Sequence, residues 1–275
     1  MAKKVLYLGN GKWCWTETCK VHASTIMHKN NYLQALETQD GTAITKATQD
    51  LISTSSGEHT YRFLKVQELT KKLGRRPNLG LDLDGTTGNF TDGLRTYMGT
   101  SLKIEKQLWL KKFPDPVKYA MWTGEGAWYT SRQDFIDHFS KAETEGIYRQ
   151  IPIFDFASET LNDLKAYGFN IKAITARNAS FNEDTRSWIQ THRIPARYIL
   201  NYGMQKERAK NIDLYIDDAP EVISRLIEHQ KKIVIMHQEY NSDLGHEDHT
   251  RRTNGWGPEL VNAVFELLDE RKKRS

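Results

Sequence analysis

The sequence predicts an α/β protein whose Rossmann-like parallel sheet carries helices on both faces. Short apolar runs typical of strands alternate with helix-like stretches over residues 77–88 and 150–240. Strands that alternate with helices form βαβ units, and βαβ units build a parallel sheet. Three of the apolar runs lead directly into polar, potentially reactive residues. Ligands of such sheets bind beyond the carboxyl ends of the strands, so the chemistry is expected at that edge.

The elements of this sheet can be placed from the pattern of apolar residues. Strands are expected at Leu79–Leu83, Ile171–Thr175, Tyr198–Leu200, Leu214–Ile216 and Lys232–Met236. Helices are expected at Ala157–Tyr167, Asn182–Thr191 and Ala219–His229. Residues 77–88 and 156–275 are therefore expected to form the core.

Two further regions lie outside this core. Residues 1–76 begin with the strand-like run Val5–Leu8, then turn polar, and show the pattern of an amphipathic helix at Tyr61–Leu73. They are expected to form an N-terminal appendage of unknown role. Residues 89–155 are rich in aromatic side chains and have a mostly helical pattern. They are expected to form a small helical cap, inserted after the first strand and its motif.

The composition is that of a soluble, globular protein, since 38% of the 275 residues are hydrophobic and 27% are charged. No apolar run approaches the roughly 18–20 residues that span a bilayer, and the start has too short an apolar stretch for a signal peptide. Two cysteines argue against a disulfide scaffold and favour the cytoplasm. The net charge of +4 suits an anionic substrate and does not require nucleic acid.

The first strand runs into a pair of acidic residues, Asp82 and Asp84, followed by Gly85. Side chains at positions i and i+2 leave a strand on the same side, so the two carboxylates are expected to act at one place. One can attack an electrophile while the other moves protons to and from the leaving group. Gly85 permits a tight turn. An acidic turn without chemistry is the alternative, because Asp-Gly is a common turn dipeptide.

Two later strands also end in polar residues. The second ends in Thr175-Ala176-Arg177, whose hydroxyl and guanidinium groups can bind phosphoryl oxygens, although an ordinary strand exit has the same pattern. Another is followed by Asp217 and Asp218. Adjacent carboxylates repel each other unless a cation lies between them, and hard oxygen ligands suit Mg²⁺. An acidic cap at the start of the next helix fits the same residues.

The order of these motifs is more specific than any one of them. Asp-Leu-Asp-Gly-Thr, Ile-Thr-Ala-Arg, Lys206 and Ile-Asp-Asp follow one another along the chain. This series resembles the four successive motifs of the haloacid dehalogenase superfamily, over about residues 77–240. The resemblance implies a magnesium-dependent enzyme with an α/β core of this kind. An Asp two residues after the nucleophile favours a phosphatase over a dehalogenase, because an alkoxide leaving group needs an acid.

The resemblance implies a role for each motif residue. Asp82 would attack phosphorus and form an aspartyl phosphate, while Asp84 would protonate the leaving oxygen and then activate water. Thr175 and Lys206 would hold the phosphoryl group. The expected Mg²⁺ ligands are Asp82, Asp84 through its backbone carbonyl, Asp217 and Asp218. The residues expected to contact the substrate are Gly85, Thr86, Phe90, Ala176 and Arg177.

Within the superfamily the sequence resembles the 5′(3′)-deoxyribonucleotidase branch. That branch has a small helical cap that is followed, as at Pro152 here, by a proline and then a helix. Phe90 matches an aromatic residue that borders the nucleoside in that branch. Gln238-Glu239-Tyr240-Asn241 and Asn254-Gly255-Trp256 resemble its ending. Two features depart from it: Thr86 stands where an aliphatic residue is usual, and Thr-Ala-Arg is less common there. These departures leave the nucleotide specificity open.

The sequence is compatible with three functions. The leading hypothesis is a cytoplasmic phosphatase that acts on small (deoxy)nucleoside monophosphates, with no membrane partner. One alternative is a polynucleotide 3′-phosphatase whose basic N-terminal segment grips the strand. Another is a nucleic-acid-binding or regulatory module with an idle phosphatase fold, against which the four clustered carboxylates argue. The sequence does not indicate the oligomeric state.

Cys14, Cys19 and His22, with His28 beyond them, are of types that can hold zinc. Their spacing departs from the usual C-x2-C knuckle, and no second pair of cysteines follows. Two free thiols are therefore favoured over a zinc site.

Overall fold

The structure is a computed structural model that describes residues 5–9, 12–15, 23–38, 41–52 and 57–268. The chain divides into two compact units. The smaller unit contains Met1–Pro77 and Asn162–Phe169, and the larger contains Asn78–Leu161 and Asn170–Ser275.

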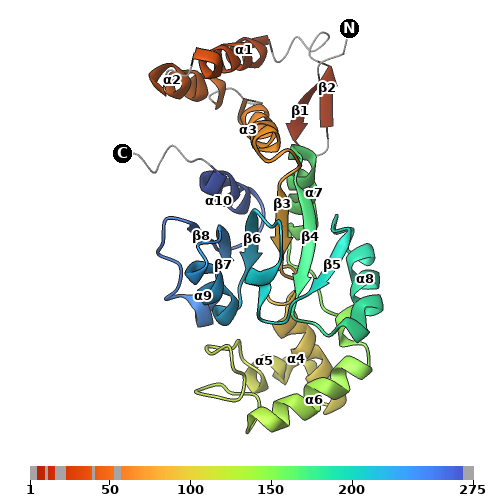
Figure 1. Cartoon of the computed structure of the whole chain (residues 1–275). Helices are drawn as coiled ribbons and strands as arrows, with labels where there is room; N and C mark the ends of the chain where they lie inside the picture. The colour runs from red at the N-terminus through yellow and green to blue at the C-terminus, as the bar shows by residue number, and fades with distance from the viewer. Residues whose placement is uncertain (1–4, 10–11, 16–22, 39–40, 53–56, 269–275) are drawn as a thin grey trace. The chain divides into compact units, whose positions relative to one another are not determined.

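The larger unit is built on a six-stranded parallel sheet, which confirms the predicted fold class. Its strands are β3 (Asn78–Leu81), β4 (Asn170–Thr175), β5 (Tyr198–Asn201), β6 (Leu214–Asp217), β7 (Ile233–Met236) and β8 (Thr250–Thr253). They lie in the order β5-β4-β3-β6-β7-β8, with helices around the sheet (Figure 1). From β3 the chain builds β4 and β5 on one side and returns to β6 on the other. Ligands of open sheets bind at such a switch.

The central strands are apolar because both of their faces are covered. Every residue of β3, β6 and β7 is buried. Continuous apolar runs of this kind are typical of strands inside a parallel sheet. Gly80 in β3 leaves no space for a side chain, since a Cβ atom there would lie 2.8 Å from Ile174 Cδ1 and 2.9 Å from Ile212 Cγ2.

The strands β4, β5, β6 and β7 agree with the prediction to within one residue, whereas β3 and β8 differ more. β3 ends at Leu81 rather than Leu83, because after Asp82 the chain turns, with Thr87 N–H bonded to Leu83 O at 2.9 Å. β8 was not predicted, since its sequence, Thr-Arg-Arg-Thr, contains no apolar residue. It is an edge strand paired only with β7, where polar and charged side chains are tolerated.

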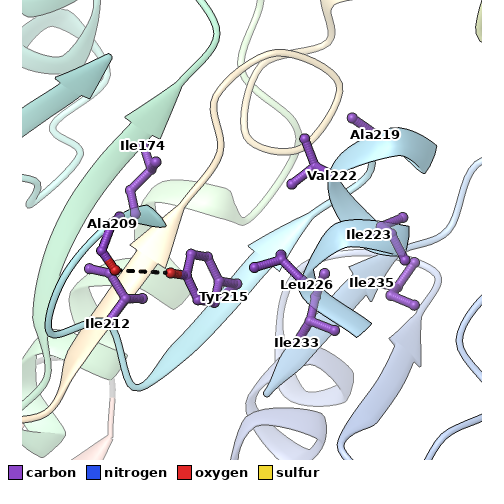
Figure 2. Close-up of a cluster of buried hydrophobic side chains, with 10 residues drawn as sticks. All are labelled: Ile174, Ala209, Ile212, Tyr215, Ala219, Val222, Ile223, Leu226, Ile233 and Ile235. Atoms are coloured by element: carbon purple, nitrogen blue, oxygen red, sulfur yellow. Dashed lines mark hydrogen bonds between the residues drawn. The ribbon is translucent and has the colours of Figure 1, made fainter. Parts of the chain in front are cut away.

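Helix α9 (Pro220–Glu228) covers part of the sheet through a buried apolar cluster (Figure 2). The buried residues of the cluster are Ile174, Ala209, Ile212, Tyr215, Ala219, Val222, Ile223, Leu226, Ile233 and Ile235. They come from β4, β6, β7, α9, the residue that precedes α9 and the segment that precedes β6. The helix is thus fixed against the strands whose ends carry the acidic residues.

The hydroxyl group of Tyr215, within this cluster, holds the turn that carries Lys206. It lies 3.2 Å from Lys206 O and 3.5 Å from Ala209 O (Figure 2 shows the second contact). These carbonyl oxygens flank the single 3₁₀ turn η5 (Lys206–Arg208). Tyr215, a residue of the central strand β6, therefore fixes the backbone position of Lys206.

Between β3 and β4 the chain inserts a mostly helical segment, residues 89–155. It contains η2 (Lys106–Leu108), η3 (Ile147–Arg149), α4 (Phe90–Ser101), α5 (Trp109–Lys112) and α6 (Arg132–Thr144). α4 begins after Asn89, whose side chain accepts a hydrogen bond from Asp92 N at 3.1 Å. Arg95 is buried on α4 and donates to Phe113 O at 2.8 Å, which ties the helix to the loop beyond α5.

The predicted helices form with nearly the predicted bounds. α7 (Ala157–Tyr167) and α8 (Asn182–Thr191) agree with the prediction, and α9 is one residue shorter at each end than Ala219–His229. The remaining elements of the larger unit are α10 (Pro258–Leu268) and the 3₁₀ turns η4 (Ala179–Phe181) and η6 (Glu239–Asn241).

In the smaller unit, β1 (Val5–Gly9) pairs antiparallel with β2 (Lys12–Trp15). Three helices follow: α1 (Ala23–Thr38), α2 (Gly41–Ile52) and α3 (Gly57–Leu73). The strand expected at Val5–Leu8 and the helix expected at Tyr61–Leu73 are both present, whereas α1 and α2 were not predicted. The choice between a zinc site and free thiols depends on the side chains of Cys14, Cys19 and His22. These side chains lie outside the part of the structure that is described.

No helix among the described residues is both long enough and apolar enough to cross a bilayer.

Candidate active site

The carboxylates of Asp82, Asp217 and Asp218 form a buried cluster at the ends of two adjacent strands. Asp82 directly follows β3, and the other two lie at the end of β6, which pairs with β3 in parallel. Each side chain is at most 5% exposed, and one carboxylate oxygen of each lies within 4.8 Å of the others. Within the described ranges, no other group of acidic, histidine and cysteine residues could hold a metal ion.

Lys206 lies against this cluster. Its ammonium group donates hydrogen bonds to Asp82 Oδ1 and, at 2.8 Å, to Asp217 Oδ2. The side chain is 2% exposed. Burial alone would lower the pKa of Lys206, but the two carboxylates outweigh this effect and raise it. The lysine is therefore a fixed positive charge next to Asp82.

One lysine does not neutralise three buried carboxylates. Burial raises the pKa of Asp82 well above its usual range, despite the opposing effect of Lys206. Burial and the neighbouring Asp217 raise the pKa of Asp218 to about 7. A further cation would remove this penalty, and carboxylate oxygens are the ligands that Mg²⁺ takes. The residues present therefore fit a divalent cation.

The two carboxylates of β6 have different partners. Asp217 Oδ1 accepts from Ala219 N at 3.0 Å and its Oδ2 accepts from Lys206, so both oxygens are bonded to fixed groups. Asp218 instead accepts from two hydroxyl groups, Thr86 Oγ1 at 2.5 Å and the phenol of Tyr240. Hydroxyl groups can reorient, so Asp218 is the freer of the two to bind a cation.

The loop after Asp82 is held tightly against Asp218. Gly85 has a φ of +83°, and a Cβ atom there would lie 2.3 Å from Asp218 Oδ2, so only glycine fits. Gln238 Nε2 donates to Gly85 O at 3.0 Å, and Trp256 Nε1 donates to Thr86 O at 3.0 Å. Residues near the C-terminus thus fix the backbone of the first motif.

The carboxylate of Asp84 is held in a two-pronged ion pair with Arg177. Nε of the arginine donates to Asp84 Oδ2 at 2.8 Å, and its terminal nitrogen Nη2 donates to Oδ1 at 2.6 Å. Asp84 is thereby held outside the cluster of the other three carboxylates. Thr175 is completely buried, and its hydroxyl accepts from Arg177 N at 3.1 Å.

A cavity of about 230 Å³ opens beside these residues. Its polar lining includes Asp84, Arg177 and Asp218, and most of its remaining lining is aromatic. The aromatic lining residues are Phe90, Tyr119, Trp122, Phe135, Phe139, Tyr148 and Tyr240. Phe90 packs edge-on against Phe139, with ring centroids 5.5 Å apart. The inserted segment supplies all of the aromatic residues except Tyr240.

The structure brings most of the predicted site residues to one place. Asp82, Lys206, Asp217 and Asp218 are in mutual contact through the buried cluster. Five others line the cavity or flank the cluster directly: Asp84, Gly85, Phe90, Ala176 and Arg177. Thr86 is completely buried, with its hydroxyl bonded to Asp218, and Thr175 is buried beneath Arg177.

Tyr240 and Tyr148 were not identified as site residues from the sequence. Tyr240 bonds to Asp218, and the ring of Tyr148 lies 4.2 Å from the Arg177 guanidinium carbon. The run Gln-Glu-Tyr-Asn indicates only a resemblance to a family, and nothing in the sequence near Tyr148 indicates chemistry.

An open parallel sheet of this strand order, with acidic motifs that meet beside a buried lysine at its carboxyl edge, is characteristic of the haloacid dehalogenase superfamily. Residues 76–265 match the family described as "5' nucleotidase, deoxy (Pyrimidine), cytosolic type C protein". The match covers more than half of the chain, and the chain belongs to this family. The resemblance drawn from the motifs is therefore confirmed.

Individual relatives are more distant. The Oceanobacillus iheyensis protein named "Putative nucleotidase OB0422" is 32% identical over 104 residues, covering 34% of this chain and 54% of that protein. The chain thus spans about half the length of this relative. Among solved structures, magnesium-bound YfnB of Bacillus subtilis is 12% identical, with a TM-score of 0.45 and coverage of 70% of this chain and 98% of YfnB. The haloacid dehalogenase-like protein SP0104 of Streptococcus pneumoniae is 13% identical, with a TM-score of 0.45 and coverage of 69% and 98%.

Proposed function

We propose that this protein is a magnesium-dependent phosphatase that hydrolyses nucleoside monophosphates through an aspartyl phosphate on Asp82. The observation that carries the proposal is the buried cluster of Asp82, Asp217 and Asp218 against Lys206, next to an aromatic cavity. A nucleophilic carboxylate needs a neighbouring positive charge to accept a dianionic phosphate, and the cluster offers the lysine and oxygen ligands for a cation.

In the first step, a carboxylate oxygen of Asp82 bonds to phosphorus as the bond to the leaving oxygen breaks. Asp84 in its protonated form gives its proton to that oxygen, and the carboxylate left behind is the form that pairs with Arg177. In the second step, Asp84 takes a proton from water while the water oxygen bonds to phosphorus. The bond between phosphorus and Asp82 breaks, and its electron pair returns to the carboxylate. Two easier displacements replace one difficult one.

The other site residues bind and orient the phosphoryl group in this proposal. Lys206 and the Thr175 hydroxyl would hold it, the backbone of Gly85 and Thr86 would border it, and Ala176, which follows the adjacent strand β4, would contact it. Mg²⁺ would be held by Asp82 and Asp218, with the backbone carbonyl of Asp84 and the support of Asp217. When bound, it offsets negative charge on the phosphoryl oxygens.

The inserted segment, residues 89–155, is proposed to act as a cap that selects the substrate. It supplies aromatic rings to the cavity, and aromatic rings stack on nucleobases. The description of the family contains the words 5′ nucleotidase, deoxy, pyrimidine and cytosolic, and the relative from Oceanobacillus iheyensis also carries the name of a nucleotidase. These similarities support a nucleotide substrate and a cytoplasmic location.

A phosphate-release screen tests the proposal. The purified chain is assayed with Mg²⁺ against ribo- and deoxynucleoside 5′- and 3′-monophosphates, sugar phosphates and 3′-phosphorylated oligonucleotides. We expect the highest kcat/KM on a nucleoside monophosphate. Preference for the oligonucleotide, with salt-sensitive binding to it, would instead indicate a polynucleotide 3′-phosphatase. No phosphate release from any substrate would contradict the proposed chemistry.

A further inference from the structure

We propose that Arg177 is a positioning residue that holds the carboxylate of Asp84 in the orientation in which it exchanges protons with the reacting group. This inference rests on the acid–base role proposed above for Asp84. It differs from the direct contact with substrate that the sequence suggested for Arg177.

The ion pair itself fixes the carboxylate plane. Two parallel hydrogen bonds, of 2.8 and 2.6 Å, join Nε and Nη2 of Arg177 to the two oxygens of Asp84. A fork of this kind sets both the distance and the rotation of a carboxylate, which a single bond does not. The side chain of Asp84 keeps 24% exposure and lines the cavity, so a held carboxylate still faces a ligand.

The guanidinium group is in turn braced by its surroundings. Arg177 is 3% exposed, and its remaining nitrogen Nη1 donates to Thr185 Oγ1 at 3.2 Å. The rings of Tyr148 and Trp188 lie 4.2 and 5.4 Å from the guanidinium carbon. Trp188 is itself held by a 2.7 Å bond from Nε1 to Ile151 O. Every nitrogen of the guanidinium group thus has a protein partner.

These contacts of the guanidinium group favour one of two possible roles for Arg177, which are to bind a phosphoryl group or to position Asp84. To bind a phosphoryl group, Arg177 would have to release Asp84 or Thr185 and leave its aromatic contacts. To position Asp84, it need only stay where it is. A group that is held by packing and hydrogen bonds is suited to orient a reacting residue, because small displacements of such a residue are costly in rate.

The test compares Arg177→Met and Asp84→Asn, singly and together, in the full chain with Mg²⁺. Single-turnover release of the leaving group reports the first step alone. A nucleoside leaving group needs a proton, whereas 4-nitrophenolate does not. We expect Arg177→Met to slow nucleoside release about 100-fold and to slow nitrophenolate release only a few-fold. Asp84→Asn should likewise slow nucleoside release more than nitrophenolate release. In the double variant, Arg177→Met should slow nucleoside release little beyond the effect of Asp84→Asn alone.

Two controls guard against a loss of fold. The ratio of the two rates within one preparation does not depend on the fraction of folded protein. Arg149→Met removes a different arginine–aspartate pair, the one between Arg149 and Asp184. Arg149 is 59% exposed and does not line the cavity, so this variant should leave both rates unchanged. Arg177→Lys keeps the charge without the fork and should recover only part of the rate.

Equal losses on both substrates, which multiply in the double variant, would overturn the positioning role and indicate that Arg177 binds the phosphoryl group. The proposed function would survive that result. A parent protein that released neither leaving group would overturn the proposed function and this inference together.

Discussion

The ammonium group of Lys206 donates a hydrogen bond to the carboxylate of Asp82, and both side chains are buried. The same group lies 2.8 Å from Asp217 Oδ2. One cation thus pairs with two carboxylates that are almost completely buried. The proposed mechanism couples stability and chemistry here, because the charges that would prepare Asp82 to act as a nucleophile also have to be balanced for the chain to fold.

Lys206→Met should lower the free energy of unfolding by about 3–5 kcal/mol in the absence of metal, because it leaves buried carboxylates without their partner. Denaturant unfolding in EDTA measures this. Lys210→Met, at an exposed position nearby, is the matched control and should change stability by less than about 0.5 kcal/mol. Equal stability of the two variants would show that the pairing contributes nothing.

Asp218→Ala should raise the Mg²⁺ concentration needed for half-maximal activity, and excess Mg²⁺ should restore part of the rate. The affinity for Mg²⁺ should fall because the site has only a few carboxylate ligands and this change removes one of them. Asp217→Ala should lose stability instead, because Asp217 accepts bonds from Lys206 and Ala219. Titration of activity against Mg²⁺ for both variants decides the assignment, and the reverse result would exchange the two roles.

The stability of the metal-free protein and the additional stability that Mg²⁺ provides should change in opposite directions with pH. Burial and Asp217 raise the pKa of Asp218 to about 7, so the folded metal-free protein binds more protons than the unfolded chain between about pH 4 and 7. The free energy of unfolding therefore falls as pH rises through this range. Bound Mg²⁺ favours the ionised form, so the increase in Tm caused by Mg²⁺ should be small at pH 5 and largest near pH 8. A pH-independent increase would contradict this.

Phe90→Ala should weaken activity on a nucleoside monophosphate about tenfold or more, while sparing a generic alkyl phosphate. Stacking of a base on an aromatic ring contributes roughly 1–3 kcal/mol, and Phe90 lines the cavity next to Asp84. Kinetics on both substrates with one preparation provide the comparison. Equal losses would mean that Phe90 only packs against Phe139 and supports the inserted segment.

Much of the fold follows from local patterns. β3, β6 and β7 were predictable because buried central strands are continuous apolar runs. β8 was not, because an edge strand paired on one side only can carry arginines. α1 and α2 were not predicted either, although both contain apolar residues, because many threonine, asparagine and glutamine residues are interspersed among them.

The candidate site was predictable where chemistry is confined to strand ends, as at Asp82 and Asp217. Long-range partners were not. Tyr240 bonds to Asp218 and Arg177 pairs with Asp84 across 93 residues of sequence, and no spacing rule indicates such contacts. The motifs indicate the groups that are proposed to react, whereas the contacts that hold these groups depend on packing between distant segments.

The central claim is that Asp82 forms a covalent bond with phosphorus. The direct measurement is phosphate release by Asp82→Asn and by the parent protein, on the best substrate of the screen and with Mg²⁺ present. An amide keeps the shape of the side chain but is not a competent nucleophile. We expect the rate to fall by about three orders of magnitude or more, with circular dichroism unchanged. Phosphate release within a few-fold of the parent rate would contradict the mechanism.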